Sequence, residues 1–200
     1  MADASYQPKV YHKQGGDELV VASGGAITVE PGGTIGGTNG TPGAGISDGT
    51  GTVFKSSIER VGDIIRTTVL IDLTGLASST TDLDIIGTGT EPAYLGQITA
   101  ANNGTVFSGR VKCLEAPVGG VTDIDLYSAT EATGVFDGGI AALTETAILT
   151  SGGAWTLGTS TELGALPAAD QYLYLTGGAA GTAAAYTAGK FLIELEGYAA

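Results

Sequence analysis

The clearest alternation of hydrophobic and polar positions lies in residues 64–73, which read Ile-Ile-Arg-Thr-Thr-Val-Leu-Ile-Asp-Leu. The odd positions are all apolar or β-branched: Ile65, Thr67, Val69, Ile71 and Leu73. The even positions include Arg66, Thr68 and Asp72. Because successive side chains leave a strand on opposite faces, this period of two predicts a half-buried β-strand. We expect it to be the first strand of a folded β domain.

Short strand-like segments continue through the rest of the chain and are separated by turn residues. They lie at 83–86, 93–98, 105–114, 122–127, 135–136, 154–157, 172–175 and 191–195. Asn-Asn-Gly at 102–104 and Asp-Gly-Gly at 137–139 are typical turn sequences. Many short strands with frequent turns predict a β-sandwich or a barrel rather than alternating strands and helices. Residues 140–149 are the one stretch that we interpret as a short helix.

The C-terminal strand has the second clear alternation. Phe191, Ile193 and Leu195 share one face, and Glu194 and Glu196 share the other. We expect the strand at 172–175 to pair with it. The Ala-, Gly- and Thr-rich link at 177–189 is predicted to be an exposed loop.

The first 14 residues contain aromatic and apolar side chains, among them Tyr6, Val10 and Tyr11, beside His12 and two lysines. This composition is consistent with an extended segment with aromatic anchors, and equally with a disordered terminus. Next comes a repeat with a period of eight: Val-Val-Ala-Ser-Gly-Gly-Ala-Ile at 20–27 aligns with Thr-Val-Glu-Pro-Gly-Gly-Thr-Ile at 28–35.

Each repeat unit combines a short strand pattern with a Gly-Gly turn, but two units are too few to bury a core alone. We therefore predict an arm that becomes ordered on a partner surface. Residues 36–51 contain seven glycines and are predicted to be a flexible linker or a long loop. The expected organisation is an arm over residues 1–60 and a β-sandwich domain over residues 61–200.

Composition and charge agree with this organisation and restrict the partners. The chain has 34 glycines among 200 residues and a net charge of −13. Residues 1–66 hold seven acidic and five basic side chains, a net charge of −2, which leaves −11 for residues 67–200. An acidic domain repels nucleic-acid phosphates and anionic lipid, so we expect neither nucleic acid nor membrane as a partner. The near-neutral arm can still bind an acidic surface.

The single cysteine, Cys113, excludes an intrachain disulfide and a zinc site built from cysteines, and we expect a buried thiol. The N-terminus has no signal-peptide pattern, and no apolar run reaches membrane-spanning length. We therefore expect a soluble protein that is synthesised in a cytoplasm.

No arrangement typical of catalysis is found, so we expect no enzymatic activity and no cofactor. The only imidazole, His12, lies in the arm, far in sequence from any candidate serine nucleophile. Two pairs of alternating acids, Asp82 with Asp84 and Asp123 with Asp125, can either bind calcium or form the solvent face of a strand. Trp155 is expected in the core or at its rim.

Three features together resemble the small virion structural proteins of tailed bacteriophages, in particular capsid decoration (cement) proteins. They are the repeats at 20–35, the acidic Gly-, Thr- and Ala-rich domain entered through Arg-Thr-Thr-Val-Leu-Ile-Asp-Leu-Thr-Gly-Leu at 66–76, and the ending Gly-Lys-Phe-Leu-Ile-Glu-Leu-Glu-Gly-Tyr at 189–198. The resemblance implies a jelly-roll-like or related β-sandwich, commonly a homotrimer, on the outer capsid surface of the virion. There it would stabilise the shell by bridging subunits of the major capsid protein.

The resulting prediction is an all-β chain, with a β-sandwich or jelly-roll-like domain preceded by an extended Gly-rich N-terminal β-arm. The resemblance provides no site residue, but the arm offers candidates for contact with the capsid. They are Tyr6, Val10, Tyr11, His12, Val21, Ile27, Val29 and Ile35. Two other function classes stay open: a tail or head-fibre component, and a carbohydrate-binding adhesion module, which would need an exposed aromatic patch.

Overall fold

The computed structural model describes residues 10–12, 15, 19–25, 40–181 and 183–199. The chain divides into two units, residues 1–35 and residues 36–200, and each is described by itself. In the first unit, β1 (Val10–His12) pairs with β2 (Leu19–Val21) in antiparallel orientation, with Val10 opposite Val21.

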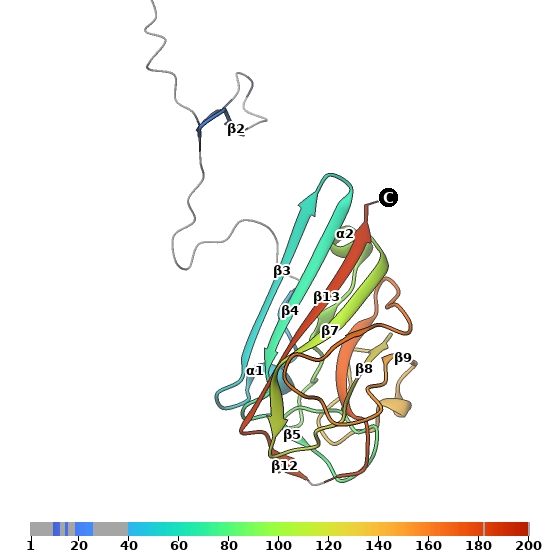
Figure 1. Ribbon diagram of the computed structural model, residues 1–200. Helices are drawn as coiled ribbons and strands as arrows, with labels where there is room; N and C mark the ends of the chain where they lie inside the picture. The colour runs from blue at the N-terminus through green and yellow to red at the C-terminus, as the bar shows by residue number, and fades with distance from the viewer. Residues whose placement is uncertain (1–9, 13–14, 16–18, 26–39, 182, 200) are drawn as a thin grey trace, which may run out of the picture. The chain divides into compact units, whose positions relative to one another are not determined.

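The second unit contains two sheets whose strands all pair in antiparallel orientation. Its elements are α1 (Ala44–Ser47), β3 (Val53–Val61), β4 (Ile64–Asp72), β5 (Ala77–Ser78), β6 (Gly96–Gln97), α2 (Ala100–Asn103), β7 (Thr105–Val118), β8 (Ile124–Ala129), the 3-10 turn η1 (Ile140–Ala142), β9 (Glu145–Leu149), β10 (Ser160–Glu162), β11 (Tyr172–Gly177), β12 (Ala184–Ala185) and β13 (Ala188–Tyr198). The large sheet has the order β10-β7-β13-β4-β3 and the small sheet has the order β6-β11-β8-β9. β5 and β12 form a separate two-stranded pair at one end of the domain (Figure 1).

The strand order is that of a jelly roll. The first long strand of the roll pairs with the last (β4 with β13), and the inner pairs nest within it: β6 with β11, β7 with β10, and β8 with β9. The eight strands thus behave as one long hairpin rolled into two facing sheets. β3 adds a further strand at the edge of the large sheet. This confirms the all-β sandwich class expected from the residue pattern, in the jelly-roll-like form that the resemblance implied.

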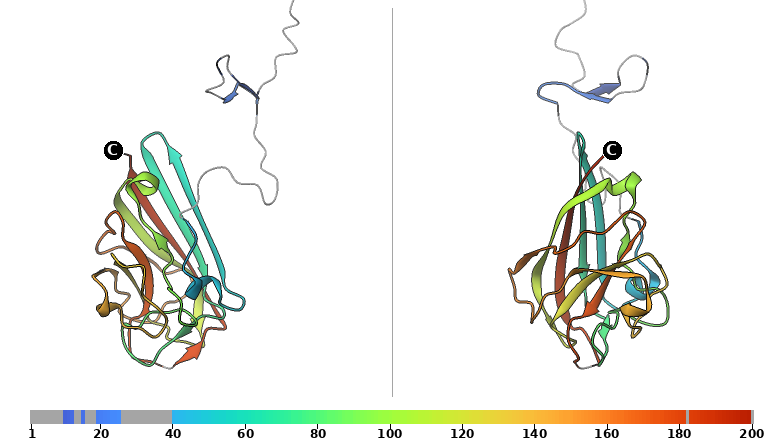
Figure 2. Two further views of the ribbon diagram at one scale, coloured as in Figure 1. Left: turned by 180° about the vertical axis from the view of Figure 1, so that it is seen from behind. Right: turned by 90° about the vertical axis from the view of Figure 1, so that its right-hand side faces the viewer.

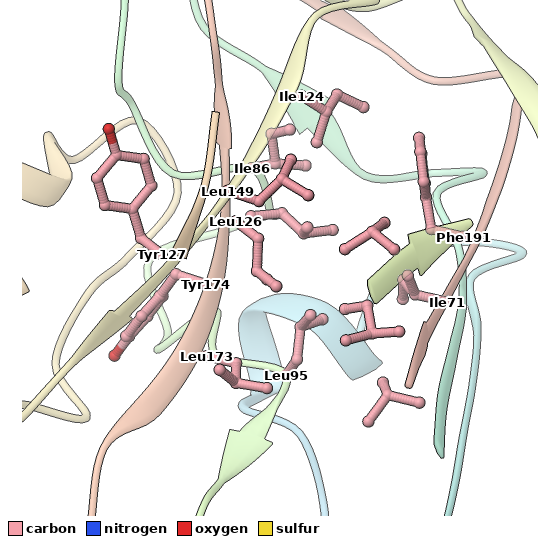
Figure 3. Packing of buried hydrophobic residues seen from close by; sticks show 14 of the residues in the cluster. Ile71, Ile86, Leu95, Ile124, Leu126, Tyr127, Leu149, Leu173, Tyr174 and Phe191 are labelled. Atoms are coloured by element: carbon pink, nitrogen blue, oxygen red, sulfur yellow. The ribbon is translucent and has the colours of Figure 1, made fainter. Parts of the chain in front are cut away.

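The core lies between the two sheets. Ile65, Val69 and Ile71 of β4 are buried, as their alternation predicted, and so are Phe191 and Ile193 of β13. On the small sheet, the side chains that meet them include Leu126, Leu149 and Leu173 (Figure 3). Cys113 and Trp155 are also buried, as expected.

The domain begins earlier in the chain than the sequence suggested. The boundary expected between residues 60 and 61 falls inside β3, which pairs with β4 from Val53 to Val61. Residues 40–51 are not a free linker, because Ile46 of α1 is completely buried and the Gly43 amide donates a 2.9 Å hydrogen bond to the Tyr94 carbonyl. The glycine at position 43 is needed for close packing, since a Cβ there would overlap the Pro92 carbonyl oxygen.

Three local predictions were also wrong. β13 does not pair with the strand around 172–175; its neighbours are β4 and β7, and β11 belongs to the other sheet. Residues 140–149 form the short η1 turn and then β9, because Thr146 to Leu149 pair with β8. The link at 177–189 contains β12 and the buried Tyr186, whose hydroxyl donates to the Val121 carbonyl.

Candidate interaction surface

The predicted arm residues are only partly within the described chain. Val10, Tyr11 and Val21 lie in the β1–β2 pair with exposed side chains, and Leu19 beside them is 51% exposed. The backbone of His12 pairs with Leu19. Tyr6, Ile27, Val29 and Ile35 lie outside the described residues. The β1–β2 unit therefore presents several apolar side chains on a pair of very short strands.

Residues 20–25 of the first repeat unit adopt the local structure that its pattern predicts. β2 ends at Val21, and a turn follows in which the Gly25 amide donates a 2.8 Å hydrogen bond to the Ala22 carbonyl. Gly24 takes a φ of 76°, which a glycine adopts without strain. The second unit, residues 28–35, lies outside the described residues.

In the domain, the chain itself covers the outer face of the small sheet over β8 and most of β11. All six residues of β8 are buried, so both faces of this strand are shielded from water. Tyr127 and Tyr174 are buried, but their rings point to the side opposite Leu126 (Figure 3). The Tyr174 hydroxyl donates a 2.8 Å hydrogen bond to the Glu131 carbonyl, and burial raises the pKa of Tyr174 to about 12. Residues 131–143 thus help to close this side of the sandwich.

The outer face of the large sheet is different, because its side chains on β3, β4, β7 and β13 are partly or fully exposed, except for Asp72. Most exposed large apolar residues of the described domain belong to these strands: Val53, Val61, Ile64, Phe107, Leu114, Val118 and Tyr198. Leu157 lines a hollow together with Leu114 and Val118, which leaves Leu166 as the exception among the described residues of the domain. Because exposed apolar side chains gathered on one face are typical of interaction surfaces, this face is the candidate interaction surface of the domain.

Four of these side chains form a continuous row across the end of the sheet, which we call the terminal apolar row. Val61 is opposite Ile64, Ile64 is opposite Tyr198, and the Tyr198 and Phe107 rings lie 6.3 Å apart. The four are between 45% and 80% exposed. The row lies at the end of the domain where the β3–β4 turn and the C-terminus meet (Figures 1 and 2).

Paired charges lie on the same outer face. Glu194 accepts from Arg110 Nε at 2.7 Å and pairs with Lys112 Nζ at 2.8 Å. Farther along the sheet, Lys190 Nζ lies 3.1 Å from Asp72 and 2.9 Å from Glu115. The Arg66–Glu196 pair, at 3.3 Å, stands between this network and the terminal apolar row.

The charge of the domain is divided unevenly by the fold. Residues 40–199 hold 17 acidic and six basic side chains. Five of the basic residues and six of the acidic ones face outward on the large sheet, a net charge of −1: Lys55, Arg66, Arg110, Lys112 and Lys190 with Glu59, Asp72, Glu115, Glu162, Glu194 and Glu196. The rest of the described domain holds the other 11 acidic residues and one basic residue, Arg60, which gives it a net charge of −10. The outer face of the large sheet is therefore a near-neutral area on a strongly anionic domain.

Two carboxylates in this network should make folding stability depend on pH. Hydrogen bonds from Arg110 and Lys112 lower the pKa of Glu194, although burial opposes the shift. Burial also opposes ionisation of Asp72, but hydrogen bonds from Thr74 and Lys190 outweigh it and lower its pKa. Because these pKa values are lower in the folded state, the stability they contribute is complete above the ordinary carboxyl values and is lost as the pH falls through the folded values.

We predict that Glu194→Gln lowers the melting temperature at about pH 7, and that the difference from the wild type shrinks as the pH falls below about 4.5. The neutral amide cannot accept charge-assisted hydrogen bonds of the same strength from Arg110 and Lys112. Thermal unfolding of both proteins across this range, followed by circular dichroism, measures the effect. A difference that stays constant with pH would mean that the Glu194 charge does not contribute.

Of the two acidic pairs identified in the sequence, Asp123 with Asp125 contacts the loop around Ser151, whereas Asp82 is exposed. The Ser151 amide donates a 2.7 Å hydrogen bond to Asp125, and its hydroxyl donates to Asp123. Burial raises the pKa of Asp125, and the negative charges of Asp123 and Asp82 raise it further. The hydrogen bond from the Ser151 amide opposes this shift. Among the described residues, no group of three or more His, Cys, Asp or Glu side chains is placed to hold a metal ion. The observed contacts tie β8 to the loop around Ser151.

A second, smaller feature lies beside β6. Tyr94 and Tyr172, with ring centroids 5.0 Å apart, line a hollow of about 260 Å³. Gln97, directly opposite Tyr172 on the neighbouring strand, and Asn102 contribute amide groups to the same lining. This grouping of aromatic rings and uncharged polar side chains could not be anticipated from the low aromatic content of the chain.

Comparison of the chain with protein-family models, with curated proteins and with solved structures found no match. Within the described part of the chain, no helix is both long and apolar enough to cross a membrane.

Proposed function

We propose that this protein is a decoration (cement) protein of a tailed-bacteriophage capsid. It binds the outer surface of the shell, associates with itself as a homotrimer and stabilises the shell by bridging major capsid subunits. The observation that carries the proposal is the exposed apolar side chains of the β1–β2 unit, which is separate from the jelly-roll domain. Tyr11, Leu19 and Val21 are the contact residues that we assign to this unit.

The physical argument concerns the size of the unit. Two strands of three residues bury too little apolar surface to offset their chain entropy, so their exposed side chains gain most by docking on another surface. On a symmetric shell the same modest contact is repeated many times, and several linked contacts add avidity. The anionic domain repels the phosphates of packaged DNA, which favours a position outside the shell.

The test is deletion of residues 1–35. Because β3, α1 and the core lie after residue 35, we expect the shortened protein to stay folded and to lose binding to empty shells. Co-sedimentation with purified shells measures binding, and circular dichroism measures folding. A deletion reaching residue 53 would be a poor test, because it removes Ile46 from the core. Undiminished shell binding by the shortened protein would refute the role of the arm.

Copy number separates this proposal from the tail- or head-fibre alternative. A decoration protein should be present in a small simple ratio to the major capsid protein, whereas a fibre component should be present in tens of copies. Quantitative mass spectrometry of purified virions distinguishes the two, and only a few copies per particle would contradict the decoration role.

The hollow beside β6 favours a second candidate function, recognition of a neutral saccharide. Aromatic rings such as those of Tyr94 and Tyr172 offer apolar faces, while Gln97 and Asn102 offer hydrogen bonds to hydroxyl groups. Binding on a glycan array that is lost in Tyr172→Ala would favour this function. Binding that Tyr172→Ala leaves unchanged would count against this hollow as the site.

A further inference from the structure

We propose that the outer face of the large sheet, with the terminal apolar row as its anchor, is the surface on which a second copy of this chain docks. This inference deepens the self-association in the proposed function, but it rests on the domain alone. It therefore stands or falls separately from capsid binding by the arm.

The first argument is the continuity of the terminal apolar row. Val61, Ile64 and Tyr198 are direct cross-strand neighbours, and Phe107 extends the row onto β7. The row thus crosses four adjacent strands of a paired, rigid sheet, so docking on it requires little ordering of the chain. Aromatic residues held in this way are typical anchors of protein interfaces.

The second argument is electrostatic and identifies the occupant. Two copies, each with a net charge of −13, repel each other over most of their surfaces. Residues outside the outer face of the large sheet carry −10 of the −11 in the described domain. Two copies can approach without this repulsion only where both present their near-neutral faces. The apolar row and the balanced face coincide, although they arise from different side chains.

The third argument is the arrangement of the face. The Arg66–Glu196 pair lies next to the row, with Arg110 and Glu194 beyond it. An apolar row flanked by paired charges matches the apolar core and polar rim of specific interfaces. Because every charge in this border has an opposite charge beside it on its own chain, this face can meet the same face of another copy around a symmetry axis without leaving a charge unpaired.

Sedimentation equilibrium of the full-length protein tests this proposal. We expect the wild type to have a multiple of the 19.8 kDa chain mass, and Val61→Asp and Ile64→Asp to shift it to the single-chain mass. Val61 is 80% exposed and Ile64 lies beside a turn, so both variants should remain folded. Leu166→Asp is the matched control: it places the same charge at an exposed apolar residue outside this sheet, and it should leave the mass unchanged.

The salt dependence of association distinguishes two kinds of contact. In one, two near-neutral faces meet; in the other, the near-neutral face of one copy meets the acidic surface of a second copy. Added salt should strengthen association between two near-neutral faces, because it screens the repulsion of the two anionic domains. Weakening by salt would overturn the face-to-face contact. A wild type that sediments as a single chain at all concentrations would overturn the proposal, as would equal dissociation by Leu166→Asp.

A further outcome separates the shell from a second copy as the occupant. If the wild type is a single chain and Ile64→Asp abolishes shell binding, the face contacts the capsid and the proposal is wrong. Deletion of residues 1–35 should preserve the number of chains in the oligomer while it abolishes shell binding. Failure of capsid binding and failure of self-association are thus measured independently.

Discussion

Replacement of Phe191 by Ala is expected to lower the free energy of unfolding by about 3–5 kcal/mol, the usual cost of deleting a buried aromatic ring. Phe191 is 1% exposed at the middle of the sandwich, and its ring packs edge-on against Trp155 at a centroid distance of 5.3 Å. It lies on β13, which holds β4 and β7 together, so the cavity would weaken the centre of the large sheet. Urea denaturation followed by tryptophan fluorescence measures the change.

Phe107→Ala provides a matched control, because it deletes the same ring from an exposed position on the neighbouring strand. Both substitutions are best compared in the Val61→Asp background, so that association does not contribute to stability. We expect Phe107→Ala to lower the free energy of unfolding by much less than Phe191→Ala does. Equal losses would contradict the assignment of Phe191 to the core.

Replacement of Ile46 by Ala is expected to cost about 2–5 kcal/mol, which is the range for truncating a fully buried aliphatic side chain. Ile46 is 0% exposed although it lies in a glycine-rich stretch that resembles a linker. The surrounding backbone is held by hydrogen bonds from Gly43 to Tyr94 and from Gly45 to Pro92, so the cavity cannot easily collapse. The urea midpoint should fall with little change in the slope of the transition.

Ser47→Ala is the control for this substitution, since Ser47 is the exposed neighbour of Ile46 in α1. Its effect should stay within about 0.5 kcal/mol, as for most surface changes. A loss of similar size for both variants would indicate that residues 40–51 behave as the linker that their composition suggested.

The strands that could be predicted are those with one solvent-exposed face and one buried face. In β4 and β13 the alternation of Val69 with Leu70, or of Ile193 with Glu194, records which side chains meet the core. β8 has no such alternation, because both of its faces are buried. The glycines around α1 were misinterpreted because the same residue provides flexibility in a linker and close backbone approach in a packed segment. Only the neighbouring Pro92 and Tyr94 distinguish the two.

The candidate interaction surface, too, could be predicted only in part from the sequence. The arm residues could be chosen from the sequence, because aromatic and apolar residues in a short repeat are a local signal. The terminal apolar row could not be, because Val61, Phe107 and Tyr198 are far apart along the chain and meet only through the pairing of four strands. The sequence shows charged residues at alternate positions, such as Arg110 and Lys112, but it does not show with which other side chains they share a face of the sheet.

The sequence by itself determined the all-β class, the two clearest strands, the burial of Cys113 and Trp155, and the acidity of the domain. These properties depend on local periodicity and composition. Only the tertiary structure decided the jelly-roll order, the true start of the domain and the separation of a near-neutral face from an anionic one. The physical reason is that strand pairing joins distant segments, so which charges and apolar side chains share a face depends on register and topology. A pattern of period two states that a strand has two faces, but not which other strands complete them.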